Sequence, residues 1–308
     1  MIQVKVDPSC SAEKYTVEGP MPFNDALAIL RPYPAPTPDA AVDRAVEIAA
    51  CVSRRVSAIA CGVVPKTPRS ILGDSLLNVS GMVGEEKHKS ATDVQRLMSR
   101  FTDQVRKTAN LAMGDGIALV RPASEVPSVL ADHARLYDLA IMPMPDVNHV
   151  ARLDAQWHVE TIVFGSGHPI IIVPQGEEQG TAAAFGTIIV AWDNSRTAAR
   201  AIADAMPILH TAKQVRVLTI LGEKEIRFPQ SGAELGRHLA RHGITAVIDQ
   251  VEARGVPIGE VLRQQVTIHG GDLLVMGAYG HSRIREFILG GATKAMLTHP
   301  PAALFMSH

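Results

Sequence analysis

The chain has 308 residues, 46% of them hydrophobic and 20% charged, which is enough for one large or two ordinary domains with well-buried cores. Its 30 lysine and arginine residues nearly balance its 31 aspartate and glutamate residues. A net charge of −1 excludes a global positive field that would draw the protein to nucleic acid or to an anionic membrane. Any anion site must therefore be local.

The sequence predicts neither a membrane span nor a signal peptide. No apolar run reaches the roughly 18 residues that a membrane helix needs, and the opening MIQVKVDPSCSAEK lacks an apolar core. The 3 cysteines (Cys10, Cys51 and Cys61) show no Cys-x-x-Cys spacing, and their odd number argues against a disulfide framework. We expect a cytoplasmic protein in which Cys51 and Cys61 are buried thiols.

The first part of the chain alternates only loosely between helical and β-rich segments. A long amphipathic helix is predicted over 87–112, with one apolar face that points to a core. That face consists of Val94, Leu97, Met98, Phe101, Val105 and Ala109. Strands are predicted over 137–143 and 168–174, and the opening strand of this part runs into RPYPAP at 31–36. Residues 1–24 receive no assignment.

From residue 186 onward the same alternation is clear. Short apolar runs predict strands over 187–192, 215–220, 245–251, 272–277 and 302–307. Helical spacing between these runs predicts helices over 195–209, 231–242, 257–269 and 291–298. Strands that alternate with helices are typical of a parallel sheet covered by helices.

An internal duplication connects the two parts. YDLAIMP at 137–143 parallels GDLLVMG at 271–277, and HPIIIVP at 168–174 parallels PPAALFM at 300–306. QGEEQGTAAAFG at 175–186 carries no periodic pattern and marks the boundary. We predict two tandem, doubly wound α/β domains, 1–175 and 186–308, each a five-stranded parallel sheet with helices on both faces. They are called the first and second half below.

A glycine-rich loop stands out in the second half. Gly277, Gly280 and Gly290 surround a predicted strand end and helix start, where a backbone can approach a ligand and free N–H groups attract anions. The alternative is that these glycines only connect strand and helix, and their spacing alone is weak evidence. The basic residues between them are His281, Arg283 and Arg285. A solvated loop surface is the favoured interpretation for each, ahead of a phosphate contact.

The second half resembles the universal stress protein family in its tandem two-domain form. The family's motif is Gly, two residues, Gly, nine residues, Gly and then Ser or Thr, and Gly277, Gly280 and Gly290 match its glycines. IIVAWDNSRTAARAIADAMPIL at 188–209 also resembles the family's opening strand and helix. The resemblance covers 186–308 well and 25–174 loosely, and it implies adenine-nucleotide alpha-hydrolase-like domains.

The resemblance implies that the second half binds ATP or AMP, with or without Mg²⁺. Its pattern places Asp193 at the adenine or ribose edge, Ile220 on the base, Gly277 and Gly280 along the ribose and phosphates, and Gly290, Gly291 and Thr293 at the phosphates. Gly291 departs from the family's Ser or Thr. The lost hydroxyl removes a hydrogen bond worth roughly 0.5 to 1.5 kcal/mol.

The first half departs further from the family pattern. Pro143 and Asp146 stand where the second half has Gly277 and Gly280, and proline lacks a donor while a carboxylate repels phosphate. We predict a degenerate copy kept for packing, so that one chain binds about one nucleotide or none. The family commonly pairs through its last strand, which implies pseudo-twofold pairing of the halves, with a homodimer as a further option.

Three functions remain open from the sequence. The leading one is a stress-response or signalling protein that binds an adenine nucleotide without dedicated catalysis. A slow ATPase is the second, although the Gly-x-x-x-x-Gly-Lys-Ser/Thr, Gly-x-Ser-x-Gly and His-Glu-x-x-His motifs are all missing. The third is a structural dimer that binds no nucleotide, an alternative that the Gly291 departure leaves open.

No metal site is expected. His238 and His242 share a helical face at the spacing of paired zinc ligands, but the sequence places no third ligand near them. A basic side chain before Gly243, at a helix C-terminus, accounts for His242 without a metal.

Overall fold

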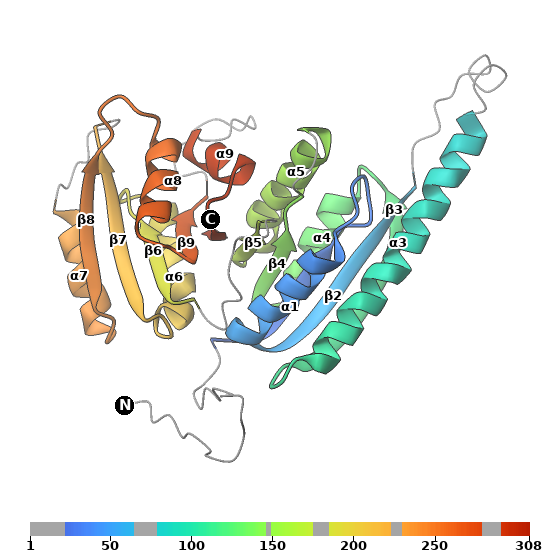
Figure 1. Ribbon diagram of the computed structural model, residues 1–308, viewed down its shortest axis with the longest axis horizontal. Coiled ribbons are helices and arrows are strands. Elements are labelled where there is room, and N and C mark those ends of the chain that lie inside the picture. Colours follow the sequence, from blue (N-terminus) through green and yellow to red (C-terminus); the bar gives the residue numbers. More distant parts are fainter. Residues whose placement is uncertain (1–21, 65–78, 146–148, 175–184, 223–229, 279–290) are drawn as a thin grey trace.

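The computed structural model describes residues 22–64, 79–145, 149–174, 185–222, 230–278 and 291–308, with side chains described outside 79–83 and 149–153. Within these ranges the strands form one 10-stranded sheet in the order β3-β2-β1-β4-β5-β10-β9-β6-β7-β8. Figure 1 shows the first half in blue and green beside the second half in yellow, orange and red. None of the described helices is long and apolar enough to cross a membrane.

Five strands and four helices make up the described first half. The strands are β1 (Phe23–Leu30), β2 (Ser53–Val64), β3 (Ala112–Pro122), β4 (Leu139–Pro143) and β5 (Ile170–Val173). The helices are α1 (Asp39–Val52), α3 (Val79–Lys107), α4 (Val126–Ala134) and α5 (His149–Ser166). All neighbouring strands of this half run parallel.

The described second half repeats this plan. Its strands are β6 (Thr187–Ala191), β7 (Gln214–Leu221), β8 (Ala246–Glu252), β9 (Leu273–Gly277) and β10 (Ala303–Ser307). Its helices are α6 (Arg196–Leu209), α7 (Ser231–Arg241), α8 (Ile258–Ile268) and α9 (Gly291–Thr298). In both halves the first strand lies between the second and the fourth, and the fifth lies beyond the fourth. The predicted fold class, two tandem doubly wound α/β units, is confirmed.

The two halves meet strand to strand. β5 and β10 run antiparallel and pair Ile171 with Phe305, so that two parallel sheets continue into one. Both strands are buried along their whole length. Each of these apolar strands therefore covers an edge of the other that would otherwise be open to aggregation.

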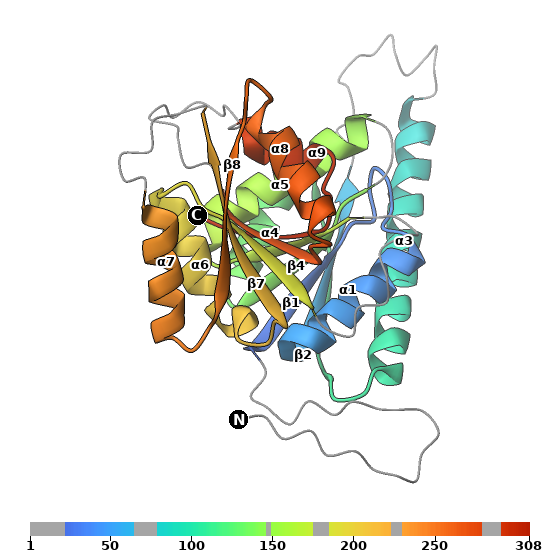
Figure 2. The same ribbon diagram turned by 60° about the vertical axis from the view of Figure 1, so that its left-hand side comes forward.

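Helices cover both faces of the sheet. One apolar cluster lies between the sheet and α1, α3, α6 and α7, and the other lies between the opposite face and α4, α5, α8 and α9. Alternation along each strand sends successive side chains to opposite clusters, as Ile188 and Ile189 of β6 illustrate. Figure 2 shows α1 and α3 on one side of the twisted sheet and α4 and α5 behind it.

The helix α3 ends earlier than the helix predicted over 87–112. Val94, Leu97, Phe101 and Val105 are buried as predicted, but the helix ends at Lys107 and Ala109 is exposed. Asn110 has a φ of 62°, a left-handed conformation that asparagine tolerates better than most residues. This turn separates α3 from β3, so the predicted helical face stops before Ala109.

The predicted burial of both described cysteines is only partly met. Cys61 is buried while Cys51 is intermediate, and neither forms a disulfide. Burial raises the pKa of the Cys61 thiol and raises that of Cys51 to about 11. Both thiols therefore stay protonated at neutral pH, which makes them poor nucleophiles.

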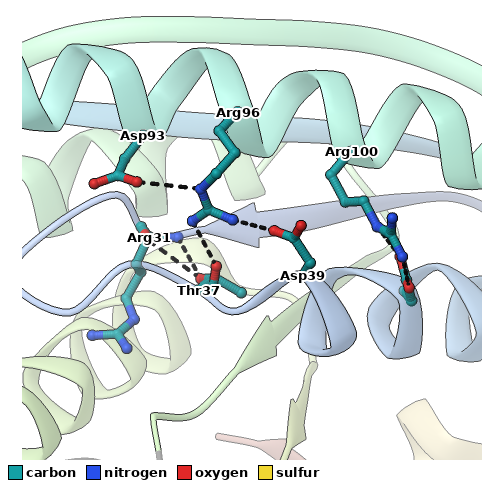
Figure 3. Close-up of polar contacts among 7 residues, drawn as sticks. Arg31, Thr37, Asp39, Asp93, Arg96 and Arg100 are labelled. Atoms are coloured by element: carbon teal, nitrogen blue, oxygen red, sulfur yellow. Dashed lines mark hydrogen bonds and ion pairs between the residues drawn. The ribbon is translucent and has the colours of Figure 1, made fainter.

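Two arginines of α3 hold the segment between β1 and α1 (Figure 3). Arg96 pairs with Asp93 at 3.3 Å and with Asp39, and it donates to the carbonyl oxygen of Thr37 at 3.1 Å. Arg100 binds both carboxylate oxygens of Asp43 on α1. The loop that follows β1, together with α1, is thereby held against α3.

Replacing Arg96 tests this anchor. We expect Arg96→Met to lower the unfolding midpoint through a loss of about 1 kcal/mol, because Arg96 makes several charge-assisted hydrogen bonds. Arg106→Met, on the exposed surface of the same helix, is the matched control. Thermal unfolding followed by circular dichroism measures both, and equal midpoints for the two variants would show that the anchor contributes nothing.

Candidate ligand site at the carboxyl ends of the strands

Strand order creates a natural binding position in the second half. β6 lies between β7, which follows it in sequence, and β9. The connections after β6 and β9 therefore leave the sheet on different sides, and ligands of open α/β sheets bind in the crevice that this reversal leaves at the carboxyl ends. Asp193 follows β6 and Gly277 ends β9, so both candidate residues lie there.

Asp193 sits in a tight turn that starts α6. Its Oδ1 accepts a hydrogen bond of 3.0 Å from the backbone N–H of Ser195, and Asn194 has a φ of 59°. Ser195 caps the helix, because its Oγ accepts from the N–H of Ala198 at 3.1 Å. Asp193 is nevertheless exposed, so its carboxylate remains accessible to a hydrogen-bond donor of a ligand.

Gly277 is explained by packing. A Cβ on this residue would lie 2.4 Å from the backbone carbon of Thr197 and 2.5 Å from the nitrogen of Ala198. Only glycine lets the first turn of α6 pack this closely on the end of β9. This requirement exists with or without a ligand, so Gly277 alone does not favour a phosphate cradle over a structural connection.

The other described candidates lie on the face of the sheet that α8 and α9 cover, or in α9 itself. Ile220 is partly buried and packs, with α8 and α9, into the cluster on that face. Thr293 is 4% exposed in the first turn of α9, which begins at Gly291. Among the described residues, a Cβ on Gly291 would meet nothing beyond its chain neighbours and its own helix. Gly280, Gly290 and the three basic loop residues (His281, Arg283 and Arg285) lie outside the described residues.

His238 and His242 lie together at the C-terminal end of α7. The rings of His238 and His242 meet edge to face with centroids 4.7 Å apart, at the last turn of α7. In the part of the chain that the structure describes, no three His, Cys, Asp or Glu side chains gather closely enough to hold a metal ion.

A pocket lies in the first half, where the sequence predicts only a packing copy. It has a volume of about 40 Å³ and lies where β1 and β2 end, beneath α4 and α5. Apolar residues form most of its wall, and the polar groups at it come from Arg31, Tyr33, Asp154 and His158. Pro143 ends the neighbouring strand β4, while Asp146 is outside the described residues.

Strand register shows that this pocket and the candidate site occupy equivalent places. Ala26 of β1 lies beside the first residue of β4, and Ile188 of β6 lies beside the first residue of β9. Arg31 follows Ala26 at the same distance along the chain as Asp193 follows Ile188, so Arg31 and Asp193 are equivalent positions. The strand neighbours of Ala26 and Ile188 on β2 and β7 show in the same way that Cys61 and Ile220 are equivalent. The first half therefore has a buried arginine where the second has an exposed aspartate.

Comparison with known proteins gives similarity at the level of structure. The sequence matches no protein-family model, and a search of curated proteins gives no match. A universal stress protein from Archaeoglobus fulgidus superposes with a TM-score of 0.64 over 93% of this chain and 96% of its own, at 12% identity.

Two proteins from Pseudomonas aeruginosa are also similar, each at 12% identity. A functionally unknown protein from strain PAO1 has a TM-score of 0.51 over 92% of both chains. A protein from strain UCBPP-PA14, proposed to be a universal stress protein, has a TM-score of 0.50 over 92% of this chain and 93% of its own. Along nearly its whole length, the chain has the fold of a tandem universal stress protein.

Proposed function

We propose that the second half binds an adenine nucleotide, ATP or AMP, and that the protein serves in a stress response or in signalling without dedicated catalysis. One observation carries the proposal: Asp193 and Gly277 lie at the carboxyl ends of the adjacent strands β6 and β9, where the strand order reverses. The glycine spacing of Gly277, Gly280 and Gly290 in the sequence supports it.

The side chains around this position suit the parts of a nucleotide. Ile220 offers a partly buried apolar surface for a base, and Asp193 offers an acceptor for an amino or ribose hydroxyl group. Gly291 begins α9 and is exposed, so among the described residues the first N–H groups of this helix are open to phosphate oxygens. A bound Mg²⁺ would neutralise part of the phosphate charge.

The structural alternative has its own supporting observation. Gly277 is required by the packing of α6, and Thr293 is almost wholly buried, so neither residue needs a ligand to explain it. A module that only pairs its halves and binds no nucleotide is therefore the second candidate. The antiparallel pairing of Ile171 with Phe305 supports a pseudo-twofold relation between domains 1–175 and 186–308.

Calorimetric titration of the full chain with ATP, AMP and GTP tests the leading proposal. We expect about one adenine nucleotide per chain and weaker binding of GTP. Asp193→Asn should bind roughly tenfold more weakly, because it keeps the oxygen that accepts from Ser195 but loses the charge available to the ligand. Glu252→Gln, which changes an exposed carboxylate at the end of β8, is the matched control and should bind as the wild type does.

Mass analysis of small molecules released from the purified, denatured protein provides an independent measurement. No nucleotide in either experiment would favour the structural module. Two nucleotides per chain would mean that Pro143 and Asp146 do not disable the first half.

A further inference from the structure

Arg31 places a buried charge in the pocket of the first half. Its side chain is 3% exposed, and among the described residues nothing accepts a hydrogen bond from its Nε or Nη1. Asp154 Oδ2 forms an ion pair with Nη1 at 3.7 Å, beyond hydrogen-bonding distance, and it lies 3.3 Å from Nδ1 of His158. Among the described residues this buried oxygen accepts no hydrogen bond. Buried polar groups that lack a hydrogen bond are costly and rare, so three of them at one pocket call for an explanation.

The guanidinium keeps its charge in this place. Burial lowers the pKa of Arg31 to about 10, and the neighbouring carboxylate of Asp154 acts in the opposite direction. At neutral pH the side chain is still a cation. The pocket therefore presents a positive charge in an environment where water screens it little.

The backbone fixes the direction of this side chain. The carbonyl oxygen of Arg31 accepts a hydrogen bond of 2.8 Å from the backbone N–H of Thr37. The backbone N–H of Arg31 donates to Thr37 Oγ1 at 3.0 Å. Arg96 holds the Thr37 carbonyl in turn. In Figure 3 the guanidinium of Arg31 extends away from this network, so the network positions the side chain without using its donors.

The surroundings limit the size and shape of a ligand. The volume of about 40 Å³ limits the ligand to a small molecule, and Cys61, Val126 and Leu130 form part of the apolar wall. His158 lies 5% exposed beside Asp154, and its Nδ1 is 2.8 Å from the Asp154 carbonyl oxygen. That contact holds the α5 side of the pocket in place.

We propose that this pocket binds an oxyanion that carries a hydroxyl, a 2-hydroxycarboxylate or hydrogen phosphate. The two terminal nitrogens of Arg31 form a fork that matches two oxygens of a carboxylate or phosphate, and Asp154 Oδ2 accepts from the ligand hydroxyl. Arg31 Nη1 and Asp154 Oδ2 then both have partners. Because Arg31 occupies the place of Asp193, the first half presents a cation to its ligand where the second half presents a carboxylate, and it is more than a copy retained for packing.

The experiment compares glycolate, acetate and phosphate on the full chain, with sodium chloride at equal ionic strength as the baseline. Isothermal titration and the shift of the unfolding midpoint measure binding. Glycolate and phosphate should bind the wild type with a dissociation constant on the order of millimolar and should raise the midpoint. Acetate, which lacks the hydroxyl, should bind several-fold more weakly than glycolate.

Arg31→Met removes the charge at similar length and should weaken glycolate binding at least tenfold. Its midpoint without ligand should fall below that of the wild type, since the Asp154 carboxylate loses the cation with which it pairs. Arg121→Met, an exposed arginine at the end of β3, is the matched control and should keep the glycolate response. If Arg31→Met fails to fold, Arg31→Lys keeps a charge, loses the fork and should still bind several-fold more weakly.

Asp154→Asn separates the two parts of the proposal. Acetate should bind this variant more tightly because a repelling carboxylate is gone, and the preference for glycolate over acetate should shrink. A glycolate response that survives in Arg31→Met, or a wild type that responds no more than it does to chloride, would overturn the site. Asp193→Asn should leave the glycolate response unchanged, so this result is independent of whether the second half binds a nucleotide.

Discussion

Gly277→Ala is expected to destabilise the protein by about 3 kcal/mol, although it adds only one methyl group. The added Cβ would lie 2.4 Å and 2.5 Å from backbone atoms of Thr197 and Ala198, which cannot rotate away as a flexible side chain could. Either α6 moves off the end of β9 or the strand shifts, and both changes disturb the buried cluster beneath α6. Urea unfolding followed by circular dichroism measures the loss.

Gly291→Ala is the matched control. Gly291 is the first residue of α9, and among the described residues outside its own helix and its chain neighbours no heavy atom lies within 4 Å of the position that its Cβ would occupy. Alanine is also the better helix former, so this variant should be as stable as the wild type or slightly more stable. Equal losses in the two variants would show that the close approach of α6 to Gly277 is wrong.

This result bears on how the nucleotide proposal is tested. Loss of nucleotide binding in a Gly277 variant would follow from a displaced α6, which carries the turn of Asp193, even if Gly277 never touches a ligand. Binding must therefore be compared at equal folded fraction. Asp193→Asn is the cleaner substitution, because its amide oxygen can still accept from Ser195.

Most of the second half was predictable because its patterns are strong and local. The apolar runs predicted strands at 215–220 and 272–277, and the structure has β7 at Gln214–Leu221 and β9 at Leu273–Gly277. Such runs, separated by helical spacing, constrain both the type and the position of each element. The joining of the two sheets through their last strands, β5 and β10, was in turn expected from the resemblance to a family that commonly pairs through its last strand.

What the sequence could not supply depends on distances between elements. The sequence alone does not show whether Gly277 contacts a phosphate or makes room for Thr197. The packing of α6 on β9 reveals the second role. Arg31 lies in a proline-rich connection, where a charged side chain is normally exposed, so its burial gives no local signal. The internal duplication held one clue, since the opening strands of the two halves correspond, but only the strand register places Arg31 opposite Asp193.

Phe305→Ala is expected to cost about 3 to 5 kcal/mol, a large part of the stability of an ordinary domain. Phe305 is wholly buried in β10, where it pairs with Ile171 of β5 and with Val275 of β9. Val247→Ala, at a 41% exposed position of the edge strand β8, is the control and should cost much less.

The same variant tests whether the junction couples the two halves. The 2 tryptophans of the chain divide evenly, with Trp157 in α5 of the first half and Trp192 at the end of β6 in the second. Trp157→Phe and Trp192→Phe backgrounds therefore give a fluorescence reporter for each half during urea unfolding. Because the Phe305 side chain belongs to an apolar cluster that runs through both halves, Phe305→Ala should lower both unfolding midpoints by similar amounts. A loss confined to the Trp192 reporter would mean that the halves unfold independently and that the β5–β10 pairing contributes little to the first half.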